Sequence, residues 1–123
     1  MAVDWHRYCK GKDFAVEGND VVVQLRARRQ QRVTVHDEPD AYLLVSRVAS
    51  RVVMEKDRDL TIAAWGRNRH TELVGFYIDK GRLMGSGWVP KAGLTADEFQ
   101  LYLRAVAGEC DRYEFQLTGK DGA

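Results

Sequence analysis

The chain has 123 residues, of which 45% are hydrophobic and 30% are charged. This balance is typical of one globular domain and excludes a disordered chain, so we predict a single α+β domain over residues 1–123. The chain carries 19 Lys and Arg against 18 Asp and Glu, a formal net charge of +1. That near-neutrality argues against a dedicated nucleic-acid-binding protein, which usually has a clear basic excess.

The sequence contains no run of about 18 apolar residues, so we expect no membrane-spanning helix. Its first residues lack the positive segment and apolar core of a secretory signal. A disulfide between Cys9 and Cys110 is an alternative, but a chain without an export signal is expected to keep both thiols reduced. These features predict a cytoplasmic protein.

Residues 1–13 are polar and aromatic, and they predict an N-terminal arm. The arm is either weakly structured or held in place by Trp5 and Tyr8. It lacks the periodicity of an amphipathic helix.

Residues 14–49 carry the pattern of β-strands. Apolar and polar residues alternate over residues 21–28 and again over 33–36, as in half-buried strands. Arg29-Gln30-Gln31 is the expected turn between them, although one long bent strand also fits. Pro39 marks a break, because proline cannot donate to a sheet ladder, and residues 42–49 form a third strand. Short connections favour an antiparallel meander of three strands.

A helix and a hairpin are predicted next. Asp57 or Asp59 can cap a helix that ends within residues 66–70. Residues 74–78 form a strand, Asp79-Lys80-Gly81 turns the chain, and residues 82–89 return. Gly85-Ser86-Gly87 lies inside the returning strand, where a bulge or a close backbone approach fits better than a phosphate-binding loop.

The last third of the chain predicts a long helix. Thr95 and Glu98 have the spacing of a capping box, in which each side chain bonds to the backbone of the other residue. Apolar residues then step by 4, 3, 4, 3 and 4 down one side of a helix over residues 96–117. This stripe consists of Phe99, Leu103, Val106, Cys110, Tyr113 and Leu117. Gly108 and the alternation of residues 113–117 leave a terminal strand as the alternative; Gly119 is a candidate C-cap.

The sequence offers no recognisable catalytic or metal-binding motif. His6-x-x-Cys9 lacks a second pair of ligands for zinc, and the acidic turn at His36–Asp40 is explained by solvation around Pro39. No nucleophile elbow, Walker loop or zinc-binding helix is present. We therefore predict a non-enzymatic protein without cofactors, with a small enzyme of unfamiliar site as an alternative.

The arginines suggest a surface for a partner. If Arg26, Arg28 and Arg47 share an exposed sheet face, they form a cationic strip; the alternative is a solvated surface paired with nearby carboxylates. A nucleic acid or an anionic ligand is the second candidate for this strip. Met84 and Trp88 alternate with Ser86 on one face and would form an apolar patch if that face is exposed. The candidate partner-binding residues are Arg26, Arg28, Arg32, Arg47, Trp65, Tyr77 and Trp88.

The order of three strands, a helix, a hairpin and a long helix resembles the YbjN-like proteins and the class I type III secretion chaperones. The similar residues lie between Val22 and Leu117 and include the segments Gly66-Arg67-Asn68-Arg69, Val74-Gly75-Phe76-Tyr77-Ile78, Gly81-Arg82-Leu83, Trp88-Val89-Pro90, Leu94-Thr95-Ala96-Asp97-Glu98-Phe99 and Cys110-Asp111. The resemblance implies a non-enzymatic module, often a homodimer, that holds a partner polypeptide on its sheet and helix surfaces. Secretion chaperones begin with an amphipathic helix and are acidic, so the YbjN-like proteins are the more similar group.

Overall fold

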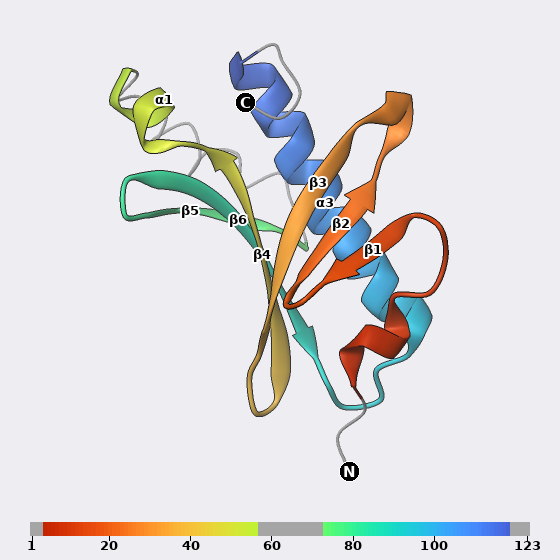
Figure 1. Cartoon of the computed structure of the whole chain (residues 1–123). Coiled ribbons are helices and arrows are strands. Elements are labelled where there is room, and N and C mark those ends of the chain that lie inside the picture. The colour runs from red at the N-terminus through yellow and green to blue at the C-terminus, as the bar shows by residue number, and fades with distance from the viewer. Residues whose placement is uncertain (1–3, 57–72, 119–123) are drawn as a thin grey trace.

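The computed structural model describes residues 4–56 and 73–118. Its strands form one antiparallel sheet in the order β1-β2-β3-β4-β6-β5 (Figure 1). The strands are β1 (Phe14–Glu17), β2 (Asp20–Gln24), β3 (Gln30–Asp37), β4 (Ala41–Ala49), β5 (Gly75–Asp79) and β6 (Arg82–Pro90). The helices are the 3₁₀ turns η1 (Trp5–Tyr8) and η2 (Arg26–Arg28), and the α-helices α1 (Arg51–Lys56) and α3 (Ala96–Thr118). The predicted α+β class is confirmed, and the helix expected between residues 57 and 70 lies outside the described residues.

The meander has four strands before α1, whereas the sequence predicted three. The additional strand, β1, pairs with β2 from Phe14↔Val23 to Glu17↔Asp20. Gly18 between them adopts a φ of 65°, the left-handed conformation that glycine tolerates. Four residues of β1 are too few for their alternation to stand out in the sequence.

The strand predicted over residues 21–28 is too long, and the expected turn at residues 29–31 is wrong. β2 ends at Gln24, and the chain turns through η2, where the Leu25 amide donates to the Arg29 carbonyl at 2.7 Å. Arg28 takes a φ of 63° to complete this turn. The turn closes through backbone bonds, which the alternation of side chains does not reveal.

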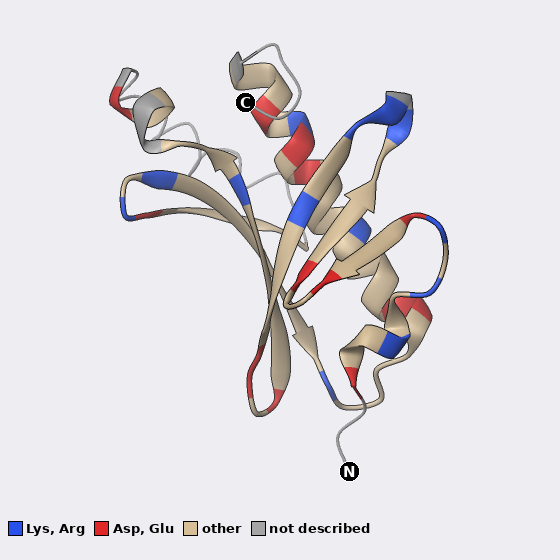
Figure 2. Cartoon of the chain, in the orientation of Figure 1, with Lys and Arg blue, Asp and Glu red and all other residues tan. Residues whose placement is uncertain are grey.

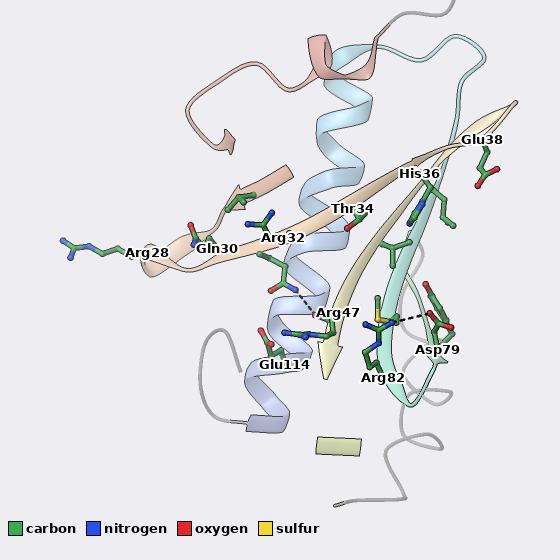
Figure 3. A pocket seen from close by; sticks show the side chains of 16 residues that line it. Arg28, Gln30, Arg32, Thr34, His36, Glu38, Arg47, Asp79, Arg82 and Glu114 are labelled. Atoms are coloured by element: carbon green, nitrogen blue, oxygen red, sulfur yellow. Dashed lines mark hydrogen bonds and ion pairs between the residues drawn. The ribbon is translucent and has the colours of Figure 1, made fainter. Parts of the chain in front are cut away.

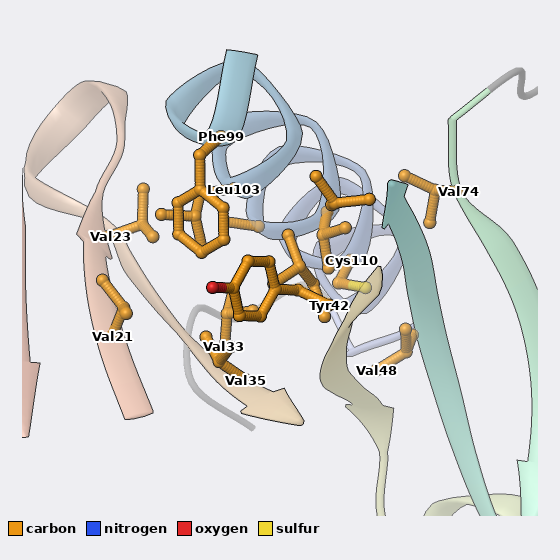
Figure 4. Close-up of a cluster of buried hydrophobic side chains, with 14 of the residues drawn as sticks. Val21, Val23, Val33, Val35, Tyr42, Val48, Val74, Phe99, Leu103 and Cys110 are labelled. Atoms are coloured by element: carbon orange, nitrogen blue, oxygen red, sulfur yellow. The ribbon is translucent and has the colours of Figure 1, made fainter. Parts of the chain in front are cut away.

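α3 lies across one face of the sheet and packs its apolar side against it. Its stripe from Phe99 to Tyr113 is buried, and Leu117 packs against the edge of the core. Valines at alternate positions of β2 and β3 point toward it, together with Tyr42 of β4 (Figure 4). The ring of Phe99 meets that of Tyr42 edge-on at 5.4 Å between centroids. α3 runs without a break from Ala96 to Thr118, which confirms the continuous helix and excludes the terminal strand over residues 113–117.

The start of α3 uses half of the predicted capping box. The Glu98 amide donates to the Thr95 hydroxyl at 3.2 Å. The Glu98 carboxylate accepts a bond from that same hydroxyl at 3.1 Å, instead of reaching the Thr95 backbone. Both bonds still satisfy groups at the first turn and stabilise the helix start.

Trp5 and Tyr8 tie the first turn of the chain to α3. Trp5 is buried, and both rings lie near Phe99, with the Tyr8 centroid 5.3 Å away. The Gln100 side-chain amide donates to the Tyr8 carbonyl at 2.7 Å.

Two glycines of β6 allow α3 to approach the sheet closely. A Cβ on Gly85 would overlap Cys110 Sγ, and a Cβ on Gly87 would lie 2.7 Å from Val106 Cγ2. The close approach expected for Gly85-Ser86-Gly87 is thereby confirmed. The pairing of β4 with β6 is regular over these residues, and its irregularity falls at Arg47–Ala49 of β4 instead.

We predict that Gly85→Ala lowers the free energy of unfolding by about 1–3 kcal/mol, because the added methyl overfills the contact with Cys110. Urea denaturation measures the change. Gly75→Ala is the matched control, since a Cβ there has nothing within 4 Å. The double variant Gly85→Ala, Cys110→Ala is expected to lose less unfolding free energy than the two single variants lose together, because the smaller side chain at position 110 makes room for the added methyl. Equal destabilisation by the Gly75 and Gly85 variants would contradict close packing at β6.

Candidate functional site

The sheet face opposite α3 carries a mixed row of apolar and cationic side chains across five strands. The register pairs Val22 with Arg32, Arg47 with Met84, and Met84 with Tyr77. Because side chains alternate along a strand, all five share the face away from the core. We call this surface the open face. Its next row contains Val45 and Thr34, and the row beyond contains Leu43 and Trp88.

The open face is hollowed where β3 and β4 separate. Their pairing runs from Asp37↔Tyr42 only to Thr34↔Val45, and the two strands then diverge (Figure 1). Side chains bridge the gap: the Gln31 amide donates to Ser46 Oγ at 2.7 Å and to the Arg47 carbonyl at 2.9 Å. The Ser46 hydroxyl donates to the Arg32 carbonyl at 2.7 Å. These bonds replace ladder bonds and hold the split at a fixed width.

The resulting hollow has a volume of about 1140 Å³ and extends from the β2–β3 turn to the β5–β6 hairpin (Figure 3). Val22, Leu43, Val45 and Met84 form its apolar part. Glu114, a buried residue of α3, also lines it.

Charge in the hollow is uneven. Its cations are Arg28, Arg32, Arg47 and Arg82, and its carboxylates are Glu38, Asp79 and Glu114. Arg32 lies 3.1 Å from Asp20 and 3.4 Å from Glu17, and Arg82 lies 3.9 Å from Asp79. Within residues 4–56 and 73–118, no carboxylate lies within ion-pair distance of Arg28 or Arg47. Figure 2 shows basic residues at the β2–β3 turn and along β3 and β4, with acidic residues at the β1–β2 and β3–β4 turns.

Of the residues proposed from sequence, Arg32, Arg47 and Tyr77 meet on the open face. Trp88 shares that face but lies outside the hollow, and it is 56% exposed. Trp65 lies outside the described residues. As expected, Phe76 and Tyr77 point to opposite faces, and Phe76 is buried.

The expected strip of Arg26, Arg28 and Arg47 along strands is wrong. Arg26 and Arg28 belong to η2, because the strand ends before them. Arg28 reaches the rim of the hollow from this turn, whereas Arg26 does not line it. The sequence also missed Gln31 and Glu114. Gln31 could have been noticed as the polar residue that continues the core-facing alternation of Val33 and Val35.

A buried ion pair fixes the β2–β3 turn against α3. Arg29, which follows η2, lies 3.0 Å from the carboxylate of Asp111, and Asp111 is only 2% exposed. The Arg29 guanidinium also lies 5.1 Å from the centroid of the Phe115 ring. The same turn carries Arg28 and leads into β3. The ion pair therefore fixes the position of the β2–β3 turn, which forms one rim of the hollow.

We predict that Arg29→Leu lowers the free energy of unfolding by about 2 kcal/mol, because it leaves the Asp111 carboxylate buried without this cation. The figure is below that of a fully buried pair, since water reaches part of Arg29. Arg26→Leu, an exposed position of the same turn, is the control and should change stability by less than about 0.5 kcal/mol. Similar urea midpoints for the two variants would contradict the role of the pair.

The two thiols are poorly suited to nucleophilic chemistry. Both are buried and free. Burial raises the pKa of Cys9 to about 11 and that of Cys110 to about 12, so both are protonated near neutral pH. The exposed His6 ring bonds to Asp4 and to the Gly18 carbonyl, and these bonds raise its pKa.

In the part of the chain that the structure describes, no group of three His, Cys, Asp or Glu residues is arranged to hold a metal ion. No helix there has the length and hydropathy of a membrane span. The feature that stands out is a shaped surface of apolar and cationic side chains, which can bind a partner.

Comparison with known proteins finds similarity among solved structures. No family model and no curated protein matches the chain. Among solved structures, a chain of the crystal structure of the ExsC–ExsE complex superposes with a TM-score of 0.57 at 16% sequence identity. The match covers 84% of this chain and 80% of that chain. The fold is type III secretion chaperone-like. At this identity the similarity concerns the fold alone.

Proposed function

We propose that the protein is a non-enzymatic, chaperone-like or regulatory module that holds a partner polypeptide on its open face. The observation that carries the proposal is the hollow beside β4, where apolar and cationic side chains lie together on a face that α3 does not cover. The ExsC–ExsE structure is a protein–protein complex built on a similar fold. We place the module in the cytoplasm as a single domain and group it with the YbjN-like proteins.

The apolar part of the open face supports this proposal. Trp88 is more than half exposed, although burying an indole ring would be strongly favourable. Leu43, opposite Trp88 on β4, is half-buried, and Met84 and Tyr77 are half-buried farther along the same face. An apolar surface that extends over several exposed or half-buried side chains marks a site of association more often than a single exposed residue does.

We expect a photo-crosslinker at Tyr77, introduced as p-benzoylphenylalanine in the cells that make the protein, to form one dominant adduct with another polypeptide. Tyr77 lies at the edge of the hollow, so a bound chain would pass within reach. Mass spectrometry of the adduct identifies the crosslinked segment. The control is the same replacement at Lys12, an exposed residue away from the open face.

An equal adduct yield at Tyr77 and Lys12, or no adduct at Tyr77, would count against partner binding on this face. Circular dichroism of each purified variant establishes that the crosslinker leaves the fold intact. A single crosslinked segment, repeated across preparations, is the outcome that the proposal requires.

We also propose that the protein forms a homodimer through the outer surface of α3. Leu101 is 55% and Phe115 is 45% exposed on this helix. They lie 14 residues apart, which places them within about 40° of one side. Gly108 lies midway, and a Cβ there would meet nothing within 4 Å, so the fold of one chain does not require this glycine. A two-fold contact centred on Gly108 would bring Leu101 against the Phe115 of a second copy.

Light scattering on the purified protein at about 100 µM is expected to give twice the chain mass, and Leu101→Glu is expected to return the chain mass. The reason is that a charge placed against the Phe115 ring of the second copy is costly to desolvate. Ala15→Glu, an exposed position on β1, is the control and should leave the mass unchanged. A monomer mass for the unmodified protein removes the dimer from the proposal.

A further inference from the structure

We propose that the segment held on the open face is acidic, with a carboxylate two residues from an apolar side chain. This inference rests on the proposed function and specifies the partner's chemistry. The carboxylate would pair with Arg47, with Arg32 adding to the attraction across the hollow, and the apolar side chain would cover Val45 and Met84.

Arg47 is the central observation. It lies on β4, an interior strand, and faces the hollow with Met84 beside it on β6. Its side chain is exposed, and no described carboxylate lies within ion-pair distance of its guanidinium. A guanidinium offers five donors in a planar fork that matches a carboxylate. Arg47 therefore presents unused donors at the middle of the sheet.

Arg32 supplies a second cation in the same hollow, across the split between β3 and β4 from Arg47. The bond from the Ser46 hydroxyl to the Arg32 carbonyl links the two strands beside these arginines. Arg32 contacts Asp20 and Glu17, but its side chain is 53% exposed, and such surface pairs are weak. It can therefore attract the same acidic segment from the other side of the hollow.

Arg28 adds positive charge at the rim. Its φ of 63° is a conformation that costs a residue with a Cβ about 1 kcal/mol and that glycine adopts readily. The turn thus holds an arginine where backbone geometry favours a smaller residue. Its exposed guanidinium strengthens the attraction for an anionic segment at the open end of the hollow (Figure 3).

The spacing along β4 sets the expected pattern in the partner. Val45 and Arg47 are two residues apart, which in a strand is about 6.6 Å. An extended segment that runs along β4 repeats this interval between its own alternate side chains. An acidic residue over Arg47 then places the residue two positions away over Val45, with Leu43 next along β4 and Met84 beside Arg47.

The carboxylates around the hollow favour a peptide over a nucleic acid. Glu38 and Asp79 line it, and Asp20 and Glu17 lie beside Arg32. A nucleic acid carries a phosphate at every nucleotide and would place several of them against these groups. A peptide can place single carboxylates at the arginines and neutral residues elsewhere.

The test begins with a random dodecapeptide library displayed on phage and selected on the full chain. We expect enriched peptides to carry Asp or Glu two residues from an aliphatic or aromatic residue. The strongest peptide is then synthesised with a fluorescent label, and fluorescence anisotropy gives its affinity. Replacing its acidic residue by the corresponding amide should weaken binding at least about tenfold. Affinity should also fall as NaCl rises.

The arginine is tested with a matched pair of variants. Arg47→Gln should weaken the peptide at least about tenfold, whereas Arg7→Gln, the same change at an exposed residue of η1 that does not line the hollow, should alter affinity by less than about twofold. Circular dichroism and thermal melting verify that both variants fold. Should Arg47→Gln fail to fold, the amide peptide decides the result, because it leaves the protein unchanged.

Four outcomes would overturn the inference: no enriched peptide, enriched peptides without acidic residues, equal binding of the amide peptide, or tighter binding of a labelled single-stranded 12-nucleotide DNA. Each differs from failure of the proposed function. A dominant adduct at Tyr77 whose crosslinked segment lacks acidic residues would leave partner binding in place and remove only the acidic preference.

Discussion

The close contact between α3 and β6 determines which parts of the molecule are available to a partner. Glycines at positions 85 and 87 let the helix lie against the backbone of β6, and any larger residue there would push it away. A helix is about 10 Å wide, whereas six strands at about 4.8 Å spacing span more than twice that width. The sheet curves around α3, so that valines of β2 and β3 still reach it (Figure 1). The apolar side of α3 packs against this face only. The opposite face of the sheet is therefore not covered by α3, and it carries both apolar and charged side chains.

The two halves of α3 meet the sheet through different chemistry, and this difference accounts for the hollow. The first half, around Phe99 and Leu103, packs against apolar side chains where the strand ladders are regular. The second half brings Asp111 and Glu114 to the sheet, at the level where β3 and β4 separate. Buried carboxylates need polar surroundings, so this end of the interface contains hydrogen-bonded and charged groups beside the close contacts of Cys110 and Tyr113. The separation of β3 and β4 therefore lies where the buried carboxylates of α3 meet the sheet.

The sequence was most informative where a pattern extends over many residues. Apolar spacing over about five turns identified α3, and alternation with a glycine turn identified the hairpin of β5 and β6. The sequence was least informative where a backbone hydrogen bond determines the direction of the main chain. The short β1 offered too few alternations, and the end of β2 is set by the bond from Leu25 to Arg29. That one turn moved Arg26 and Arg28 off the sheet, while Arg32 and Arg47 stayed on it because their strands are long.

The composition of the hollow also bears on selectivity. An apolar surface alone would accept many segments, because burial of apolar area is not directional. Arg47, beside Met84 and two residues from Val45, adds a guanidinium that is stabilised only by an oxygen acceptor at one position. The carboxylates at the rim act in the opposite sense, since they repel segments whose negative charge is continuous. Apolar area then provides affinity, while a few charges at fixed places set the register of a bound segment. A chain with a net charge of only +1 can discriminate in this way because the charges that matter are local.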